Sequence, residues 1–428
     1  MASTVFIRWA SAAAMIAALA VSGCVVQETK PLPKLAAVQA TTQIPQNELL
    51  DVGIREFDAG IPADKADDTE ALAKLRIYPD LRKAEARYLP TLLRQTLESS
   101  AQWGAVRVVP QNAEFVDVLV SGEIVESTGR ELALQITARD SAGRVWIDNQ
   151  RYSSVADLGS YKTPEALKAR DPFQNVYVEI ANDLLAARQR LTAADRQDLQ
   201  RLTRLKFARD LAPEAMSGFA EPDKKGILKV TRLPAANDPF VDRIDRIRER
   251  DDTVIDTVNG YYSSFADKMS ESYGSWRQTS AVEIEKEERA RSSARMRAGL
   301  GAAAVLASIL VPDQCAGDAY TCRNVQSAAR TAGAVGGIAA VLSGIQKFSD
   351  ARTHAESLKE LSESFQAEVA PQVIDIEGRT LRLTGTAEEQ YEEWRKLLRQ
   401  IYLEETGTAE TVALPSAAAT ADQNESQN

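Results

Sequence analysis

Hydrophobic and polar residues alternate through the first organised block of the chain, residues 49–190. Leu50, Val52 and Ile54 are separated by polar residues or glycine, and this period of two predicts a strand with one buried face. Four further strands are predicted, at 106–109, 116–124, 132–136 and 145–147. The short connections at 127–129 and 141–143 imply that the strands they join form antiparallel hairpins.

Apolar residues spaced three and four apart predict two helices in the same block. The first covers residues 82–100 and contains Pro90, which marks a kink or a new helix start. The second is predicted at 176–184, in a position to lie across the sheet. The residues that define the two helices are Ala86, Leu89, Leu93 and Leu97, and then Val176, Ile180 and Leu184. We therefore expect an α+β block with a small, mostly antiparallel sheet and helices.

The second block, residues 191–295, is predicted to be mainly helical. Thr192 and Asp195 form a helix start, and the leucine stripe that follows ends near Pro213. A short strand is predicted at 227–230, before a long amphipathic helix. The apolar seam of that helix consists of Val258, Tyr262, Phe265, Met269, Tyr273 and Trp276. Such a stripe belongs to a core or a helix partner far more often than to a ligand site.

The third block, residues 296–348, is rich in glycine and alanine. Residues 298–312 and 331–346 contain no charged side chain, and they predict a helical hairpin. Small residues at intervals of four line one edge of its second helix, so that another backbone can come close. These residues are Gly333, Gly336, Gly337, Ala340 and Gly344. We expect this edge to serve helix packing or self-association.

The uncharged runs of 15 and 16 residues reach roughly 22–24 Å as helices, which is short of a hydrocarbon core of ~30 Å. A packed hairpin, buried in this chain or against copies of itself, is therefore favoured. Insertion into a bilayer as part of a helical ring is the alternative.

The last block, residues 349–406, is predicted to contain a charged helix, a small β-hairpin at 373–383 and a terminal helix. Thr386 and Glu389 form a capping box for the terminal helix. That helix presents one apolar face, made of Tyr391, Trp394, Leu398 and Ile401. Residues 407–428 are rich in alanine, asparagine and glutamine and predict a disordered tail.

The amino terminus has the pattern of an export signal. One cation, Arg8, precedes an apolar run that ends in small residues directly before Cys24. Residues 1–23 therefore resemble the signal peptide of a bacterial lipoprotein, and the resemblance implies that Cys24 is lipidated. Val25 in place of aspartate implies sorting to the outer membrane, facing the periplasm. An uncleaved anchor helix or an ordinary secretory signal is the alternative, and residues 24–48 are expected to form a flexible tether.

Charge and cysteine usage agree with an exported protein. The formal net charge of −10 makes nucleic acid an unsuitable partner. Beyond Cys24, only Cys315 and Cys322 remain, and an oxidising compartment would join them as a clip across a turn. A metal site is the alternative, but two thiols without a nearby histidine do not complete a tetrahedral zinc site.

Four segments of the first block carry a family resemblance, namely residues 51–57, 82–89, 117–124 and 140–146. In order and pattern they look like envelope lipoproteins of the curli-secretion (CsgG-like) and TolB amino-terminal type. The resemblance covers about a third of the chain. It implies a small sheet with helices on one side, which relatives use for assembly or partner binding and not for catalysis. The long C-terminal half departs from those relatives.

Residues for catalysis are sparse. The one histidine, His354, lies on a segment that reads as an exposed helix, so triads and zinc sites that need histidine have little support. We expect no cofactor beyond the lipid on Cys24, and no enzyme activity. The hypothesis is a lipid-anchored envelope protein that binds envelope partners or copies of itself. The alternative is a peptidoglycan-active enzyme or an activator of one, working through a pair of carboxylates that sequence alone does not select.

Overall fold

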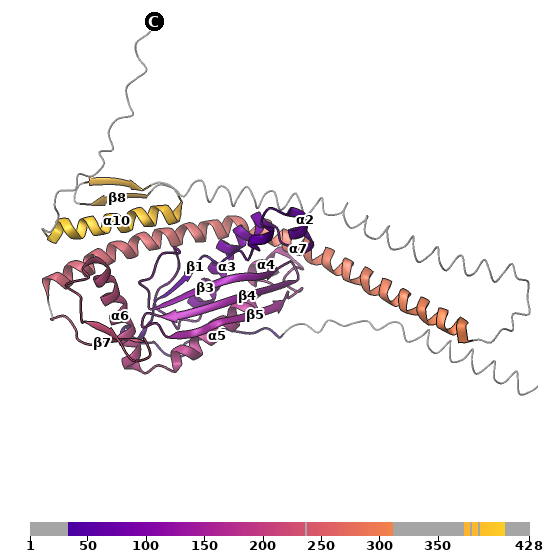
Figure 1. Cartoon of the computed structure of the whole chain (residues 1–428), viewed down its shortest axis with the longest axis horizontal. Coiled ribbons are helices and arrows are strands. Elements are labelled where there is room, and N and C mark those ends of the chain that lie inside the picture. Colours follow the sequence, from indigo (N-terminus) through magenta and orange to yellow (C-terminus); the bar gives the residue numbers. More distant parts are fainter. Residues whose placement is uncertain (1–32, 236–237, 311–371, 377–378, 384–385, 407–428) are drawn as a thin grey trace, which may run out of the picture. The chain divides into compact units, whose positions relative to one another are not determined.

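A five-stranded mixed sheet forms the base of the fold (Figure 1). The structure is a computed structural model and describes residues 33–235, 238–310, 372–376, 379–383 and 386–406. The strands lie in the order β2-β1-β3-β4-β5. Their bounds are β1 Val52–Arg55, β2 Val106–Val109, β3 Val118–Ser127, β4 Glu131–Asp140 and β5 Val145–Val155. The predicted α+β class is confirmed.

Strand directions divide the sheet into two halves. The connections predicted to be hairpins do join antiparallel strands, β3 with β4 and β4 with β5. Strand β1 instead runs parallel to both β2 and β3. A parallel pair needs a crossover, and helix α3, Pro79–Ser99, supplies the one between β1 and β2. The sheet is therefore mixed, and its longest pairings are the antiparallel ones.

Helix α3 continues unbroken through Pro90, so the proline does not mark a new helix. A proline leaves the carbonyl four residues earlier without its helical donor. Here that carbonyl belongs to Ala86, and it accepts a hydrogen bond of 2.9 Å from the backbone N–H of Phe57. The gap that Pro90 leaves in α3 thus joins the helix to the chain just after β1.

One face of the sheet is covered by α3 and by α5, Gln174–Gln189. Leu134 and Ile136 of β4 are fully buried on this face, and Val176, Ile180 and Leu184 of α5 are fully buried as well. The alternate residues of β3 and β4 are more exposed, as Glu123 and Arg139 show. The alternation of apolar and polar residues in these strands therefore reflects one face that is covered by helices and one face that is more exposed.

Two long helices follow the sheet. Helix α6, Ala193–Leu211, begins at the predicted helix start, where Thr192 and Asp195 form a capping box and bond each other's backbone. A small hairpin, β6 Ala220–Pro222 with β7 Leu228–Val230, leads to helix α7, Pro239–Leu310. All six residues of the predicted apolar seam of α7 are buried. Because α7 is one helix, it runs without interruption past residue 295, where the predicted second block ends.

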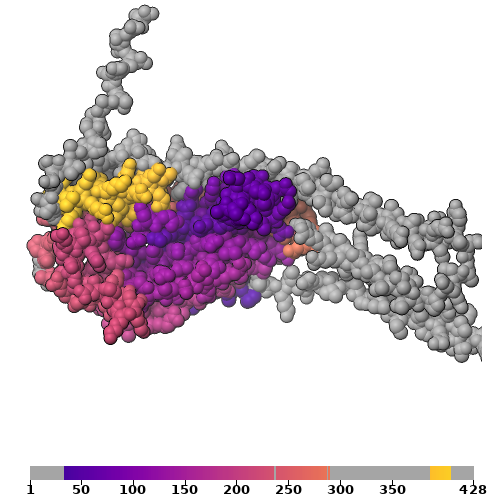
Figure 2. Space-filling view, in the orientation of Figure 1, coloured from indigo at the N-terminus to yellow at the C-terminus, as the bar shows by residue number. Residues whose placement is uncertain are grey.

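The described part of the chain ends in a hairpin and a helix. Strands β8, Gln372–Ile376, and β9, Arg379–Leu383, pair antiparallel as predicted, and α10 spans Ala387–Thr406. The apolar face predicted for α10 is buried, and α10 packs against α7 (Figure 2). The remaining elements are short: η1 Gln46–Glu48, η2 Ala63–Lys65, α2 Thr69–Lys74 and α4 Pro164–Ala169.

Several predictions fall wholly or partly outside the described residues. The first arm of the proposed hairpin is helical as far as Leu310, and the second arm lies outside. The segment predicted as a tether is described from Pro33 onward, and from Leu35 it is bound to α5. The N–H of Leu35 donates to Asn175 Oδ1 at 3.1 Å, and the N–H of Val38 donates to Asn182 Oδ1 at 3.0 Å.

Candidate functional site

None of the site residues selected from the sequence lies in the described ranges. Cys24, the Cys315–Cys322 pair and His354 are outside them. The same holds for the small residues of the packing edge, which are Gly333, Gly336, Gly337, Ala340 and Gly344. Lipidation of Cys24, the disulfide and the role of the packing edge therefore remain predictions.

A buried ion pair attaches α7 to the connection that precedes α5. Arg277 of α7 is 2% exposed, and its guanidinium binds Asp171, with Nη2 at 2.6 Å from Oδ2 and Nη1 at 3.3 Å from Oδ1. Asp171 lies in the connection that precedes α5. The guanidinium also stacks over the ring of Tyr273, 4.4 Å from its centroid. A planar, two-point contact of this kind fixes both position and rotation of α7.

A second buried contact lies four residues earlier on α7. The hydroxyl groups of Tyr273 and Ser127 each donate to Glu85 Oε1, both at 2.6 Å. Burial raises the pKa of Glu85, although Arg82 and the two hydroxyl donors act in the opposite direction. Glu85 is fully buried on α3, Ser127 ends β3, and Tyr273 belongs to α7. One carboxyl group thus holds together three elements that are far apart in the sequence.

The backbone of α7 also touches the sheet directly. Gly129, in the connection between β3 and β4, lies so close to α7 that a Cβ there would overlap the carbonyl oxygen of Arg277 and the nitrogen of Ala281. Gly274 faces Leu167 of α4 in a similar way, because a Cβ at position 274 would lie 2.5 Å from Leu167 Cδ2. The two glycines let α7 pack close to the β3–β4 connection and to α4.

Helix α10 is held to the body by charges around an apolar seam. The indole N–H of Trp394 donates to Asp251 Oδ1 at 3.1 Å, and burial raises the pKa of Asp251 to about 6. Arg395 bonds Asp210 of α6 and stacks over the ring of Phe115, 4.8 Å from its centroid. The middle of α10 is therefore fixed to α6 and α7 by buried polar contacts.

Two carboxylates meet at the amino-terminal end of α10, beside the carboxyl ends of β1 and β2. The Tyr262 hydroxyl donates to Glu56 Oε2 at 3.3 Å and is also within hydrogen-bonding reach of Glu388. Arg87 Nε lies 3.3 Å from Glu56 Oε1. The backbone N–H of Gln111 donates to Glu388 Oε2 at 2.9 Å. We name this group, Glu56, Tyr262 and Glu388, the carboxylate pair site.

Both carboxyl groups of this site have raised pKa values. Burial raises the pKa of Glu388 to about 7, and the charge of Glu56 adds to the effect. Burial also raises the pKa of Glu56, against the lowering effects of Arg87 and Tyr262. Perturbed carboxyl groups at the carboxyl ends of parallel strands are a common signature of functional sites. This site is therefore the best-formed candidate for proton transfer among the described residues.

Sequence reasoning did not find these contacts, although one signal was present. Glu85 lies four residues before Leu89 on α3, and Arg277 lies four residues after Tyr273 on α7. Both charged residues therefore occupy the apolar stripe of their helix, where an ionic side chain is expected only if it has a partner. The carboxylate pair joins positions 56 and 388, and no local pattern connects them.

Comparison with known proteins gives no relative: no family model, no curated protein and no solved structure matches this chain. Within the described ranges, no group of three or more histidine, cysteine, aspartate or glutamate side chains is placed to hold a metal ion. The helices in the same ranges include none that is both long and apolar enough to cross a membrane.

Proposed function

We propose that this protein is a lipid-anchored component of the bacterial envelope, attached through Cys24 to the outer membrane and facing the periplasm. It acts by binding partners or copies of itself and not by turning over a substrate. The resemblance of residues 1–24 to a lipoprotein signal supports the anchor. The resemblance of the sheet block to curli-secretion and TolB amino-terminal domains supports a role in assembly.

The observation that carries the assembly role is the attachment of α7. Arg277 and Tyr273 fix this helix to the helical layer on the sheet, through Asp171 before α5 and Glu85 of α3. Beyond these contacts, α7 continues as a helix to Leu310, through most of the first uncharged run of 298–312. A firmly held helix that leads into a glycine- and alanine-rich segment is well suited to present that segment to another helix.

Membrane fractionation of cells that express Cys24→Ser tests the anchor. We expect the wild-type protein to sediment with membranes and Cys24→Ser to move to the soluble pool, because acyl chains bind bilayers by about 0.8 kcal/mol per buried CH₂. Cys315→Ser serves as the matched control and should stay with membranes. An unchanged distribution of Cys24→Ser contradicts lipid anchoring at this residue.

Photo-cross-linking in cells tests the assembly role. A cross-linking residue at Gly333 or Gly337 should give adducts with a second copy or with an envelope protein. The control site is Leu233, which is 53% exposed and lies outside the glycine-rich segment. Absence of adducts from both glycine positions, or equal adducts from Leu233, contradicts a role for the packing edge.

A second candidate function is action on peptidoglycan, and the carboxylate pair site is the observation that favours it. Glycan hydrolysis uses one protonated and one ionised carboxyl group, and Glu388, with a pKa of about 7, can be protonated near neutral pH. Purified wild-type protein that releases fragments from peptidoglycan, with loss of release in Glu388→Gln, would support this function over the binding role. The matched control is Glu404→Gln on the same helix.

A further inference from the structure

Strand β5 forms one edge of the five-stranded sheet, and no described strand pairs with its outer side. It spans Val145–Val155 and is among the longest strands of the sheet. The last residue, Val155, is 44% exposed. An uncovered edge strand is a template for another extended chain.

Two hydrogen bonds fix which backbone groups of β5 point outward. The N–H of Ala156 donates to the carbonyl of Arg130 at 2.8 Å, so this opposed pair is hydrogen bonded. On the other side of β4, the carbonyl of Glu131 accepts from the N–H of Thr128 at 2.8 Å, so Glu131 faces β3. Hydrogen-bonded and non-bonded pairs alternate along an antiparallel ladder. The N–H and C=O groups that face away from β4 therefore belong to Arg151, Ser153 and Val155.

A bulge limits this edge at its amino-terminal side. Asn149 has a positive φ of 45°, and the register between β4 and β5 shifts between Ile136 and Ala138. Bulges bend an edge and interrupt regular pairing. The part of β5 that can accept another strand is therefore the regular stretch 150–155.

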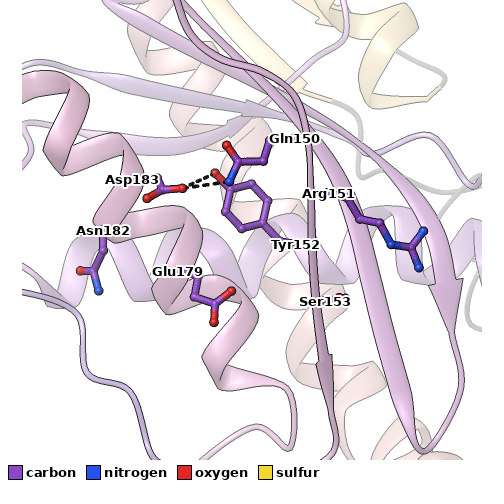
Figure 3. A pocket seen from close by; sticks show the side chains of 7 residues that line it. All are labelled: Gln150, Arg151, Tyr152, Ser153, Glu179, Asn182 and Asp183. Carbon is purple, nitrogen blue, oxygen red and sulfur yellow. Dashed lines mark hydrogen bonds between the residues drawn. The ribbon is translucent and has the colours of Figure 1, made fainter.

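A groove of about 410 Å³ runs beside this stretch, between β5 and α5 (Figure 3). On its floor, the Tyr152 hydroxyl donates to Asp183 Oδ2 at 2.7 Å, and Gln150 Nε2 donates to the same oxygen at 3.3 Å. The α5 wall of the groove carries Glu179, Asn182 and Asp183. Arg151 points away from α5 in Figure 3 and pairs with Glu126 at 3.7 Å.

We propose that the β5 edge at 150–155, together with the α5 wall, binds an extended basic segment of a partner protein as an additional strand. The outward N–H and C=O groups supply the backbone pairing. Glu179 and Asp183 select lysine or arginine at the alternate positions that face α5, because side chains of an added strand point alternately to the two faces. The proposal is independent of lipid anchoring and of the glycine-rich segment.

The charge of the groove supports a basic occupant. Burial and the neighbouring charge of Asp183 both raise the pKa of Glu179. A cation placed between these two carboxylates would offset their repulsion. The only cation in the groove lining, Arg151, is engaged with Glu126 on the opposite face.

Binding to synthetic peptides tests the proposal, using the full chain in detergent. The probe is a seven-residue peptide that alternates lysine and threonine. One control peptide alternates glutamate and threonine, and a second carries N-methyl groups on alternate backbone nitrogens of the lysine peptide. We expect measurable binding of the lysine peptide alone, weakened by salt. Equal binding of the N-methylated peptide contradicts strand pairing, and equal binding of the glutamate peptide contradicts the charge selection.

Hydrogen exchange locates the binding edge. The lysine peptide should slow amide exchange at Arg151, Ser153 and Val155, whose N–H groups face outward. The amides of Tyr152 and Ser154 already bond β4 and should change little. Protection elsewhere on the protein, with none at the three outward amides, overturns the proposal.

Substitutions on β5 and α5 test the same binding edge. Ser153→Pro removes one outward N–H, and proline is tolerated on an edge strand whose N–H faces solvent. We expect Ser153→Pro and Glu179→Gln each to weaken binding about three- to tenfold, the loss expected for one net hydrogen bond or ion pair. Ser153→Ala and Glu221→Gln, which removes a charge from β6, should bind as the wild type does.

A second copy of this chain is the competing occupant. If sedimentation shows dimers that Ser153→Pro dissociates while the lysine peptide does not compete with them, the edge pairs with itself. That result would overturn the basic-segment proposal.

Discussion

Arg277 and Asp171 form an ion pair that is almost fully removed from water, with side-chain exposures of 2% and 7%. Removing one partner of such a pair leaves the other charge buried without compensation. We therefore expect Arg277→Ala to lower the free energy of unfolding by about 3–5 kcal/mol. Urea denaturation measures this change.

The matched control is Arg289→Ala on the same helix, where Arg289 pairs with Glu285 on the surface. Exposed pairs contribute only about 0–1 kcal/mol. Equal effects of the two variants would mean that the buried pair does not hold α7 to the connection before α5.

Two glycines test the close approach of α7 to the β3–β4 connection: Gly129 lies at the contact, and Gly260 of α7 lies away from it. Gly129→Ala places a Cβ against the carbonyl of Arg277, whereas a Cβ at Gly260 of α7 meets nothing within 4 Å. We expect Gly129→Ala to destabilise the protein, by about 1–3 kcal/mol as for other overpacked sites. Gly260→Ala should stabilise it by about 0.5–1 kcal/mol through helix propensity. Thermal unfolding of both variants measures the difference in sign, and stabilisation by Gly129→Ala would contradict the observed contact.

At the scale of single residues, the sequence predicted burial well where a side chain is apolar. The seam of α7 from Val258 to Trp276 follows from spacing alone and is buried throughout. The burial of Glu85 and Arg277 was not predicted, because a charged residue in an apolar stripe is buried only where it has a partner, and local spacing does not show the partner. Their partners, Tyr273 and Asp171, are more than 100 residues away in sequence, so only the assembled fold brings them together.

At the scale of elements, local signals located most helices and strands but not their pairing. Turn lengths predicted the β3–β4 and β4–β5 hairpins, because a short connection admits only an antiparallel neighbour. The parallel placement of β1 between β2 and β3 depends on how α3 packs on the sheet, and no short motif encodes it. The carboxylate pair site lies at this junction, and it could not be predicted for the same reason.

Helix α10 should become less stably docked as pH rises. Glu388 has a pKa of about 7 in the folded protein, above its ordinary value of 4.5. A raised carboxyl pKa favours the folded state fully below 4.5, and this contribution is lost as pH rises from about 4.5 through 7. We expect the unfolding free energy to fall across this window, and we expect Glu388 to contribute on the order of 2–3 kcal/mol of that fall.

Glu388→Gln should remove the part of this pH dependence that belongs to α10. Asp251, with a pKa of about 6, titrates in the same window and remains in the variant as an internal reference. Denaturation at pH 5 and pH 8 measures the effect, and Glu404→Gln serves as the control for a lost surface charge on α10. Identical pH profiles for wild type and Glu388→Gln would contradict a shifted Glu388.

At the scale of the whole molecule, the segment Leu35–Ala40 limits how far the proposed lipid anchor can lie from the body. This segment was predicted to be part of a flexible tether, because its composition lacks periodicity. In the structure, α5 and the end of α3 hold its backbone, where the N–H of Ala40 donates to the carbonyl of Ser100 at 2.9 Å. The eleven residue-to-residue steps from Cys24 to Leu35 reach at most roughly 40 Å when fully extended.

Asn182→Ala should loosen this segment, because the Asn182 side chain accepts from the N–H of Val38 and donates to the carbonyl of Ala36. Loss of two hydrogen bonds, each worth about 0.5–1.5 kcal/mol, should speed trypsin cleavage after Lys34 roughly tenfold or more. Gln189→Ala, an exposed position on the same helix, should leave the rate unchanged. Equal cleavage of Asn182→Ala and wild type would mean that the segment detaches freely, and the tether would then extend to Glu48 as its composition predicts.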